Sequence, residues 1–554
     1  MIYPGENEYI KKSGTFNVVP VYKKYFVDTE TPATIFLKLS MEKDCGKEMF
    51  LLESVEGARR LSRYSFIGAG YSHLIEFSNG VFSIFKGSGL LESEPKSMRT
   101  DRPLSKLEQF LSEYRVYKDP ELTHFLGGAV GYMSYDLVKY FENIDIPPAG
   151  TGFPEMMLYL TDCIIVFDHL LNTVNIIATV KNDSSDMDCK KAYRLSCEKI
   201  MQIENIIFKP FRHGTNHENN IRYNLMQQSH TGGNTDGILF ENNGTIPQLK
   251  NLSKSIFQDA PDGIFQNSNL SLTSNFTMGS FTEAVNRAKR YINEGEVFQL
   301  VLSQRFEVGN FSGQIDAFSI YRILRNLNPS PYMYYLSFND FKIIGSSPEP
   351  LIKVTGRKII TCPIAGTRKR GRNEGEDKKI ITSLLSDDKE KAEHNMLVDL
   401  SRNDLGRVCR YGSVKVKRYM KVEKYSHVVH LVSRVEGLLK KEETIFNALK
   451  STFPAGTLTG APKIRAMQLI SGLEPVRRGP YGGIIGYFGY DSSLDCCITI
   501  RTALAKDNKV YIQAGAGIVY DSVAENEYLE TLNKAKALLY AVIRGGQNQN
   551  NYER

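Results

Sequence analysis

The stretch "LYLTDCIIVFDHLLNTVNIIATV" (residues 158–180) consists of apolar and β-branched runs separated by short polar stretches. This pattern predicts successive β-strands. Residues 64–77, "YSFIGAGYSHLIEF", have the same strand character, whereas "TPATIFLKLS" (31–40) is typical of a helix. Residues 15–205 are therefore expected to form a unit of mixed strands and helices.

The pattern dissolves over residues 206–277, an Asn-rich tract with little periodic apolar content. Such composition predicts a low-complexity insertion or linker. Order resumes at residues 280–306, "SFTEAVNRAKRYINEGEVFQLVLSQRF", which predicts a helix with Ser280 or Thr282 as its N-cap, followed by a strand. We expect a second domain over residues 278–545 and a polar tail over 546–554.

The composition excludes several classes of protein. No apolar run is long enough to cross a bilayer, so no membrane association is expected. The net charge of +7 suits an anionic small molecule, and without a basic helix or an aromatic-basic stripe we expect no nucleic-acid partner. Eight cysteines without metal-ligand or redox spacing indicate a reducing compartment, and we expect a cytoplasmic location.

Two helical stretches carry paired carboxylates. Glu390 and Glu393 lie three residues apart within residues 387–404, and Glu527 and Glu530 repeat this spacing within residues 522–543. Residues spaced in this way share one face of a helix. The two faces together would offer hard oxygen ligands suited to Mg²⁺. For either pair alone a solvated helix face is the favoured interpretation, because glutamate is seldom buried.

Three glycine-containing stretches resemble anion-binding loops. One is "CPIAGTRKRG" (362–371), a loop with a plain alanine, Ala365, at its centre. The second, residues 452–470, is a Gly/Thr-rich turn leading into a helix, whose free N–H groups favour a carboxylate; its Ala-Pro insertion excludes a nucleotide-binding P-loop. The third, "QAGAGIVYDS" (513–522), follows the strand 509–512. Ordinary glycine turns are the alternative for each.

Arg501 and His430 are further candidates. Arg501 ends the alternating run "CITIR" (497–501), which places a guanidinium near a strand end, where it can bind a carboxylate with two hydrogen bonds. His430 follows His427 by three residues, but no third ligand lies nearby, so zinc is not expected. His430 is either a structural histidine or an acid/base residue.

Seven motifs, taken in order, resemble the chorismate-utilising enzymes, and most closely the large subunits of anthranilate synthases. The resemblance covers most of the ordered chain. The motifs are "LLESVEGARRLSRYSFIG" (51–68), "NPSPYMYYL" (328–336), "GSSPEPLIKV" (345–354), "PIAGT" (363–367), "AEHNMLVDLSRNDLGRV" (392–408), "FPAGTLTGAPK" (453–463) and "YGGIIGYFGY" (481–490).

The resemblance implies an α+β (mixed α/β) fold with two interleaved subdomains, antiparallel sheets stacked as a sandwich and flanking helices. It implies an N-terminal regulatory and scaffold domain followed by a chorismate-binding catalytic domain. It also implies roles for named residues: Mg²⁺ ligands Glu393 and Glu530, with Glu390 and Glu527 completing the acidic site; chorismate-binding residues Gly366, Thr367, Tyr481, Arg501, Gly515, Ala516 and Gly517; and catalytic residues His430, Thr457 and Lys534.

Two positions distinguish members of the family. Aminodeoxychorismate synthases carry a lysine nucleophile at the position of Ala365, and water-adding relatives carry a lysine base at the position of Gln299. Neither alanine nor glutamine can perform those roles. The resemblance therefore implies that ammonia attacks the chorismate ring directly, which yields anthranilate and pyruvate, the first committed step of tryptophan biosynthesis.

The resemblance also implies feedback inhibition by tryptophan. The site would combine Leu52, Glu53 and Ser54 with Pro331, Tyr332 and Met333, and with Gly486 and Tyr487 close by. Packing at a domain interface is the alternative for these residues. The absence of tryptophan from the chain fits either compositional bias or synthesis under tryptophan scarcity.

No cysteine lies in the context that a class I glutamine amidotransferase requires. We therefore expect a hetero-oligomer in which a separate amidotransferase subunit, component II, supplies the ammonia. Two rival functions remain open: an aminodeoxychorismate synthase, against which Ala365 argues, and a non-catalytic subunit that senses tryptophan or chorismate, against which the intact glutamates, His430 and Arg501 argue.

Overall fold

The computed structural model describes residues 1–42, 48–55, 63–87, 94–122, 125–147, 150, 152–182, 186–209, 270–424 and 428–546. Within these ranges the chain forms two antiparallel sheets of twelve strands each. Most of the expected Asn-rich insertion, part of the first motif, His427 and nearly all of the expected polar tail lie outside the described residues.

The strands follow a different order in space from their order in the chain. In the first sheet the order is β1 (Val21–Phe26), β10 (Thr173–Ala178), β9 (Cys163–Asp168), β3 (Tyr64–Ala69), β2 (Met49–Glu53), β13 (Tyr332–Ser337), β14 (Phe341–Ser347), β23 (Thr502–Lys506), β24 (Lys509–Ile518), β12 (Gln299–Gly309) and β11 (Ser271–Ser274), with β20 (Gly460–Ala461) paired to β12. In the second sheet it is β17 (Ile364–Lys369), β19 (Val428–Leu438), β16 (Lys358–Thr361), β15 (Pro350–Thr355), β22 (Leu494–Ile498), β21 (Ile484–Gly489), β7 (Gly128–Met133), β8 (Met156–Leu160), β4 (His73–Ser78), β5 (Val81–Lys86) and β6 (Lys96–Arg99), with β18 (Lys415–Lys424) paired to β19.

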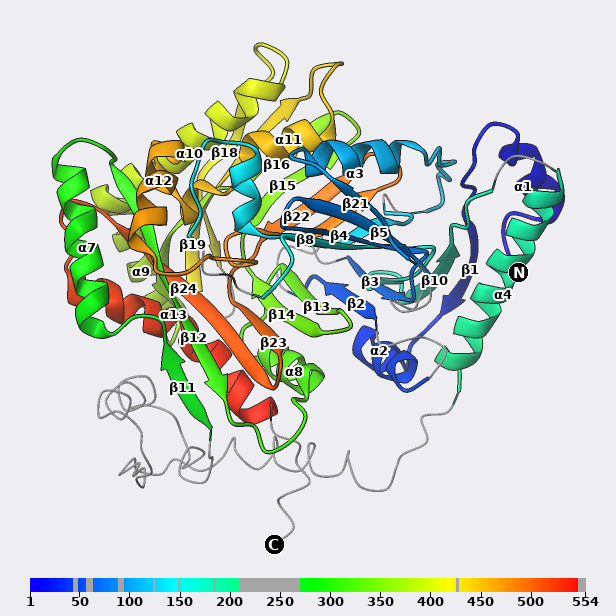
Figure 1. Ribbon diagram of the computed structural model, residues 1–554, viewed down its shortest axis with the longest axis horizontal. Helices are drawn as coiled ribbons and strands as arrows, with labels where there is room; N and C mark the ends of the chain where they lie inside the picture. The colour runs from blue at the N-terminus through cyan, green and yellow to red at the C-terminus, as the bar shows by residue number, and fades with distance from the viewer. Residues whose placement is uncertain are drawn as a thin grey trace, which may run out of the picture.

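Both sheets combine strands from the two ends of the chain. In the first sheet β2 pairs with β13, so that Glu53 lies opposite Met333. In the second sheet β7 pairs with β21, so that Gly131 lies opposite Gly486. Figure 1 shows the resulting alternation, with the blue β2 beside the green β13. The expected interleaved sandwich is therefore confirmed, whereas the expected boundaries of the domains stay a proposal.

A mainly apolar layer fills the space between the sheets. Side chains from β2, β13 and β14 meet side chains from β7, β8 and β21, and aromatic rings are prominent among them. Phe338 is fully buried there; its ring stacks on Tyr159 at 4.8 Å between centroids and packs against Phe341 at 5.0 Å. Because aromatic side chains bury large areas, this layer stabilises the sandwich strongly.

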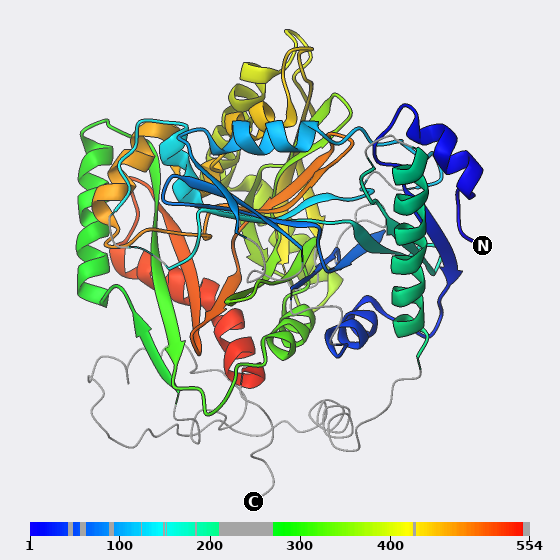
Figure 2. The ribbon, with the colours of Figure 1, turned by 45° about the vertical axis from the view of Figure 1, so that its right-hand side comes forward.

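Helices cover the outer faces of both sheets. Helices α7, α8 and α13 pack against the first sheet, and α3, α10 and α11 pack against the second. Figure 1 shows α7 at one end of the molecule and α4 at the other, and Figure 2 shows the light-blue α3 lying across blue strands. The helices are α1 (Glu6–Ser13), α2 (Pro32–Ser40), α3 (Pro103–Ser112), α4 (Asp186–Ile207), α7 (Met278–Asn293), α8 (Ala317–Leu327), α9 (Glu374–Ser386), α10 (Asp388–Val408), α11 (Ile445–Thr452), α12 (Lys463–Leu473) and α13 (Ala524–Gly545), with short 3₁₀ helices η2 (Tyr135–Tyr140) and η3 (Gly456–Leu458).

The predicted types of element are confirmed, but one predicted helix start is wrong. The expected helix at 31–40 is α2, and the expected strands at 64–77 and 158–180 are β3, β4, β8, β9 and β10. The N-cap of α7 is Thr277, so the choice of Ser280 or Thr282 was wrong. Ser280 instead closes a capping box, since its side chain accepts a hydrogen bond from the backbone N–H of Thr277.

None of the helices in the described part of the chain combines the length and apolar character that a bilayer crossing requires.

Replacement of Phe338 by alanine tests the importance of the layer between the sheets. The substitution removes a fully buried ring and leaves a cavity, so we expect the free energy of unfolding to fall by about 3–5 kcal/mol. Urea denaturation followed by circular dichroism measures this loss. The control is Phe26→Ala on β1, where the phenylalanine is 83% exposed and the expected loss is below about 0.5 kcal/mol. Equal losses in the two variants would contradict the assignment.

Candidate active site

The two acidic helix faces meet at one end of β12. On α10 the pKa of Glu393 is raised by burial and by the charges of Glu390 and Glu530, while a hydrogen bond from Gln299 lowers it. On α13 the pKa of Glu527 is raised by burial and by Glu530, and is lowered by a hydrogen bond from Ser522. The carboxylates of both helices thus act on one another, as the sequence predicted.

Basic side chains accompany two of these carboxylates. Arg368, in β17, donates a hydrogen bond to Glu390 at 2.7 Å. Lys534 lies 2.7 Å from Glu530, one helical turn earlier on α13, and also donates to the backbone carbonyl of Gly515 at 2.9 Å. Lys534 therefore connects the acidic face of α13 to β24.

The four glutamates suit a hard divalent cation in their chemistry. In the described residues no group of three or more His, Cys, Asp or Glu side chains stands close enough together to hold a metal ion. Burial is the largest cause of the raised pKa values of Glu393 and Glu527, and the charge of Glu530 adds to it. Carboxylate oxygens in a partly buried, mutually repelling set are the donors that Mg²⁺ prefers, so the residues fit this ion.

A carboxyl group that the sequence analysis did not single out lies beside the predicted catalytic threonine. Glu349 stands between β14 and β15, and Thr457 of η3 donates a hydrogen bond to it at 2.9 Å. Burial raises the pKa of Glu349 to about 7, although Thr457, Lys534 and Arg501 all act to lower it. A carboxyl group with a pKa in this range is a candidate proton donor near neutral pH.

His430 occupies the middle of the same site. It lies in β19 directly opposite Thr367 of β17 and is 4% exposed. Burial, and then the charge of Arg501, lowers the pKa of His430 to about 4. The imidazole is consequently neutral at physiological pH and can accept a proton.

Arg501 lies in the turn between β22 and β23, with a positive φ of 50°. Its guanidinium donates to the side-chain oxygen of Asn328 at 3.3 Å, and its charge acts on both His430 and Glu349. Positive φ is uncommon outside glycine. The side chain is therefore held near the two titratable residues by a backbone conformation that this residue type seldom adopts.

Gly366 and Ala365 lie in a strand, not in the loop that the sequence predicted. The register of β17 shifts between Ala365 and Thr367, which forms a bulge at Gly366 with a φ of 66°. A Cβ on Gly366 would stand 3.1 Å from the carboxylate of Glu390. Glycine is thus required both by the conformation and by the approach of the acidic helix. Ala365 pairs with Leu431 and is 9% exposed.

Gly515, Ala516 and Gly517 likewise lie within β24 and not in a turn that follows it. They pair with Ser303, Leu302 and Val301 of β12 respectively. A Cβ on Gly515 would stand 2.9 Å from the Tyr481 hydroxyl, and a Cβ on Gly517 would stand 2.6 Å from the amide nitrogen of Gln299. The two glycines therefore leave room for side chains that face the site.

A cavity of about 580 Å³ opens at this place, which is large enough for a small anionic substrate. Arg501, Asn328, Glu530 and Lys534 line it. A smaller cavity of about 40 Å³ touches Glu349 and Thr457. Arg501, Lys534 and Glu530 thus share the larger cavity, and Glu349 lies on the smaller one.

The residues predicted to bind tryptophan lie on both faces of the first sheet around β2 and β13. Leu52 and Tyr332 face the layer between the sheets, whereas Met333 and Glu53 face the outer side covered by α8. Glu53 is 1% exposed on its side chain and forms an ion pair with Arg325 of α8 at 3.1 Å. The hydroxyl of Tyr321, also on α8, donates to the same carboxylate. Leu52 and Glu53 of β2 lie opposite Tyr334 and Met333 of β13.

Gly486 and Tyr487 of this set belong to β21 of the second sheet, and Tyr332 of β13 is connected to that sheet. Tyr332 donates from its hydroxyl to Asp495 at 2.8 Å, and Asp495 pairs with Tyr487 across β22 and β21. Gly486 precedes Tyr487, whose ring lies 4.1 Å from that of Phe125. Ser54 directly follows β2, and its buried hydroxyl has no hydrogen-bond partner among the residues that the structure describes. Pro331 stands immediately before β13.

Two residues of the site escaped the sequence analysis. Glu349 and Asn328 both lie inside motifs that were recognised, yet no role was assigned to them. The signal that points to them is a charged side chain inside "GSSPEPLIKV" and an amide side chain at the start of "NPSPYMYYL", both next to mainly apolar residues.

The comparisons with known proteins agree with this geometry. Residues 71–540 match the family described as chorismate binding enzyme. Anthranilate synthase component 1 of Acetivibrio thermocellus is 40% identical over 99% of this chain and 100% of its own length. The same protein of Aquifex aeolicus is 42% identical over 97% of each chain.

Solved structures show the same relationship. Anthranilate synthase component I from Streptococcus pneumoniae is 35% identical, with a TM-score of 0.65 over 87% of this chain and 93% of that one. The menaquinone-specific isochorismate synthase of Escherichia coli is 18% identical with a TM-score of 0.62 over 97% of this chain and 98% of that one, which shows a common fold. The chain belongs to the chorismate-binding enzyme family and, within it, groups with anthranilate synthase component 1.

Proposed function

We propose that the chain is the large subunit of an anthranilate synthase, which converts chorismate and ammonia to anthranilate and pyruvate. The observation that carries this proposal is the buried Ala365 beside an intact set of acid, base and anion-binding residues. The catalytic, substrate and metal assignments below are parts of the same proposal.

Chorismate is a dianion, so its binding requires positive charge and N–H donors. Arg501 and Tyr481 hold the enolpyruvyl carboxylate, and the guanidinium can form two parallel hydrogen bonds to it. Gly515, Ala516 and Gly517 allow the backbone of β24 to approach the ring closely, because the two glycines have no side chain. Gly366 and Thr367 of β17 contribute to the same substrate site.

Glu393 and Glu530 would hold Mg²⁺, with Glu390 and Glu527 next to them. The bound ion would supply positive charge to the ring carboxylate of the substrate and polarise the ring. Lys534 keeps one side of this cluster close to β24 through its hydrogen bond to Gly515.

Glu349 assists the first chemical step. Ammonia forms a bond to C2 of the ring while the C4 hydroxyl departs, and the hydroxyl needs a proton to leave as water. The pKa of Glu349 near 7 provides a protonated carboxyl in the site, and Thr457 orients it. The product of this step is aminodeoxyisochorismate.

His430 assists the second step. Removal of the proton from C2 restores the aromatic ring as the enolpyruvyl group leaves from C3 as pyruvate. A histidine must be unprotonated to accept this proton, and His430 has its pKa lowered to about 4. His430 is therefore the candidate base, and anthranilate is the product.

The neighbouring positions exclude two other outcomes. Ala365 has no nucleophilic atom, so a covalent intermediate of the aminodeoxychorismate synthase type cannot form there. Gln299 donates to Glu393 and cannot serve as a base that activates water. Direct attack by ammonia at C2 is the reaction that remains, which favours the ortho-amino product.

The ammonia comes from a separate glutamine amidotransferase subunit, which makes the functional enzyme a hetero-oligomer in the cytoplasm. The relatives are named component 1, which fits a two-component enzyme. Free ammonium at high concentration replaces the partner.

Tryptophan binds at the residues around β2 and β13 and inhibits the enzyme. Leu52 and Glu53 pair with Tyr334 and Met333, and Tyr332 donates to Asp495, which pairs with Tyr487. The buried hydroxyl of Ser54 has no hydrogen-bond partner among the described residues, so a ligand with an ammonium or carboxylate can satisfy it.

A direct assay tests the proposed activity. The purified chain with chorismate, Mg²⁺ and a high concentration of ammonium at alkaline pH should release anthranilate, detected by fluorescence, together with pyruvate. A chelator should abolish both signals and added Mg²⁺ should restore them. Pyruvate without anthranilate would replace the proposal with a water-adding or mutase reaction, and silence from a folded, Mg²⁺-binding chain would favour a sensor.

Replacement of Glu349 by glutamine separates proton donation from structure. The amide keeps the size of the carboxyl but cannot release a proton, so we expect kcat to fall about 10²–10⁴-fold with a small change in KM. Glu296→Gln is the matched control, since this glutamate pairs with Arg465 at the surface and should leave kcat unchanged. A Glu349→Gln enzyme of normal kcat would remove Glu349 from the mechanism.

The same variant tests how the raised pKa of Glu349 makes the stability of the wild type depend on pH. The folded-state pKa of Glu349 is raised to about 7 from 4.5, so the folded chain retains a proton that the unfolded chain loses in this window. Folding therefore becomes less favourable as pH rises from about 4.5 to 7, by at most about 3 kcal/mol. Glu349→Gln should gain stability over the wild type above pH 7 and none below pH 4.5.

Replacement of Ser54 by alanine tests the tryptophan site. Loss of one hydrogen bond to a charged ligand should raise the inhibition constant for tryptophan about tenfold, with kcat and KM unchanged. Ser196→Ala is the control, because Ser196 is a buried serine of α4 that bonds within its own helix. Unaltered inhibition in Ser54→Ala would place tryptophan elsewhere.

A further inference from the structure

An ion pair lies buried behind the active site, and the proposed mechanism makes no use of it. Glu474 is the C-cap residue of α12, and Arg478 follows four residues later in the chain. Their side chains are 3% and 2% exposed, and the closest approach of nitrogen to oxygen is 2.7 Å. A buried ion pair is costly to desolvate and seldom adds stability beyond what an apolar pair would supply. Its presence therefore calls for a specific role.

The guanidinium of Arg478 connects three elements. It donates twice to Glu474, once to the carbonyl of Leu458 at 2.6 Å and once to the carbonyl of Val301 at 2.8 Å. Leu458 belongs to η3 and Val301 to β12. The planar fork of an arginine can make these four bonds at once, which a lysine cannot.

The contact with Leu458 reaches the catalytic residues directly. Leu458 follows Thr457, whose hydroxyl donates to Glu349 at 2.9 Å. The backbone N–H of Val301 donates to the carbonyl of Thr459, so β12 also fixes the other side of this turn. Arg478 thus holds the carbonyl next to the residue that orients the proton donor.

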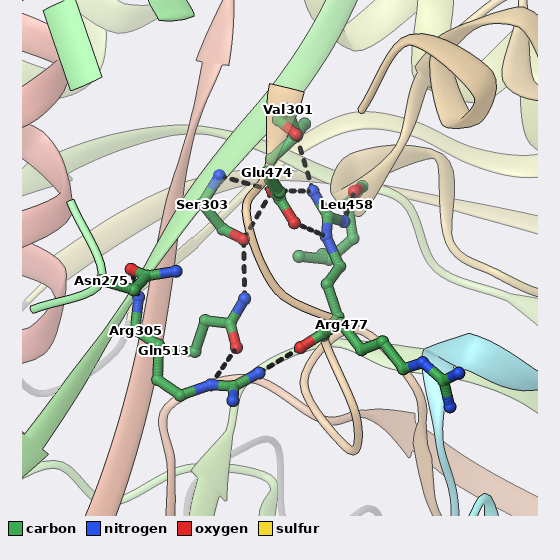
Figure 3. Close-up of polar contacts among 9 residues, drawn as sticks. Asn275, Val301, Ser303, Arg305, Leu458, Glu474, Arg477 and Gln513 are labelled. Carbon is green, nitrogen blue, oxygen red and sulfur yellow. Dashed lines mark hydrogen bonds and ion pairs between the residues drawn. The ribbon is translucent and has the colours of Figure 1, made fainter. Parts of the chain in front are cut away.

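Glu474 extends the network toward the substrate-facing strand. It accepts from the backbone N–H of Ser303 at 2.8 Å and from its hydroxyl at 2.7 Å. The Ser303 hydroxyl in turn accepts from Gln513 at 2.8 Å, and Gln513 accepts from Arg305. Figure 3 shows this chain of contacts from Leu458 and Glu474 through Ser303 and Gln513 to Arg305.

Two aromatic rings complete the surroundings of Arg478. The guanidinium carbon lies 4.7 Å from the ring centre of Tyr135 and 5.8 Å from that of Tyr481. Burial opposes the charge, but the carboxylate of Glu474 more than offsets this and holds the pKa of Arg478 above its usual range. Arg478 is charged at every pH at which the enzyme is folded, so its hydrogen bonds are permanent features of the site.

We infer that Arg478, held by Glu474, is a positioning residue that sets the Thr457–Glu349 hydrogen bond and thereby the orientation of the proton donor. This inference rests on the proposed function. Arg478 acts through the carbonyl of Leu458 and not through the substrate. Its loss therefore affects the chemical step more than substrate binding.

The first variant is Arg478→Lys, which keeps the charge but loses the fork of hydrogen bonds. We expect kcat with chorismate and ammonium to fall about tenfold to a hundredfold, because small displacements of catalytic groups have effects of this size. KM should change less than about threefold by the same reasoning. Arg63→Lys is the matched control. Arg63, immediately before β3, forms a bidentate ion pair with Asp168 of β9, and its substitution should leave kcat unchanged.

A double-mutant cycle with Thr457→Val distinguishes positioning from a general loss of stability. If Arg478 acts through Thr457, Arg478→Lys should lower kcat less than about twofold in the Thr457→Val enzyme. Full additivity of the two losses, or a normal kcat in Arg478→Lys, would overturn the inference.

Ser303→Ala provides a milder test if Arg478→Lys fails to fold. It removes one bond to Glu474 and leaves the ion pair in place. We expect a smaller fall in kcat that again disappears in the Thr457→Val background, and an additive fall would overturn the inference. The wild-type chain is assayed in parallel. A wild type that releases no anthranilate refutes the proposed function, whereas an active wild type with additive variants refutes only the role of Arg478.

Discussion

Antiparallel pairing between strands from opposite ends of the chain is the constraint on which the rest of the structure depends. The pairs β2–β13 and β7–β21 join strands that are far apart in sequence, and they form the centre of each sheet. Such long-range contacts are costly in chain entropy and need a large compensating burial. The aromatic layer between the sheets, around Phe338 and Tyr159, supplies it.

The proposed regulatory and catalytic sites are connected through β13 and α8. β13 carries Met333 of the tryptophan set, and α8, which pairs Arg325 with Glu53, leads directly into Asn328. Asn328 accepts from Arg501 of the substrate site. Glu53 and Arg501 are thus connected through α8 and Asn328.

Burial gives the candidate site its chemistry. Glu349 and His430 are both stabilised in their neutral forms, one as a protonated carboxyl and the other as a free imidazole. The same low-dielectric surroundings make the Arg478–Glu474 pair a rigid support, since all four of the arginine's bonds are short and shielded from water. The pKa values of the two side chains are thus set by where each side chain is buried and not by its residue type alone.

The sequence by itself determined the elements with a strong local signal. The i, i+3 spacing of Glu390 and Glu393, and of Glu527 and Glu530, correctly placed them on helices, and the order of the motifs correctly indicated the family. Local signals failed where a hydrogen-bond partner elsewhere in the structure decides the conformation. Gly366 and Gly515 lie in strands because β19 and β12 supply their hydrogen-bond partners, and the start of α7 moved to Thr277 because a reciprocal bond with Ser280 is available there. Only the tertiary structure decided that burial raises the pKa of Glu349 and that Arg478 bonds the carbonyl next to Thr457. A pKa depends on burial and on neighbouring charges, and a hydrogen-bond network depends on distances between residues that the chain order keeps far apart.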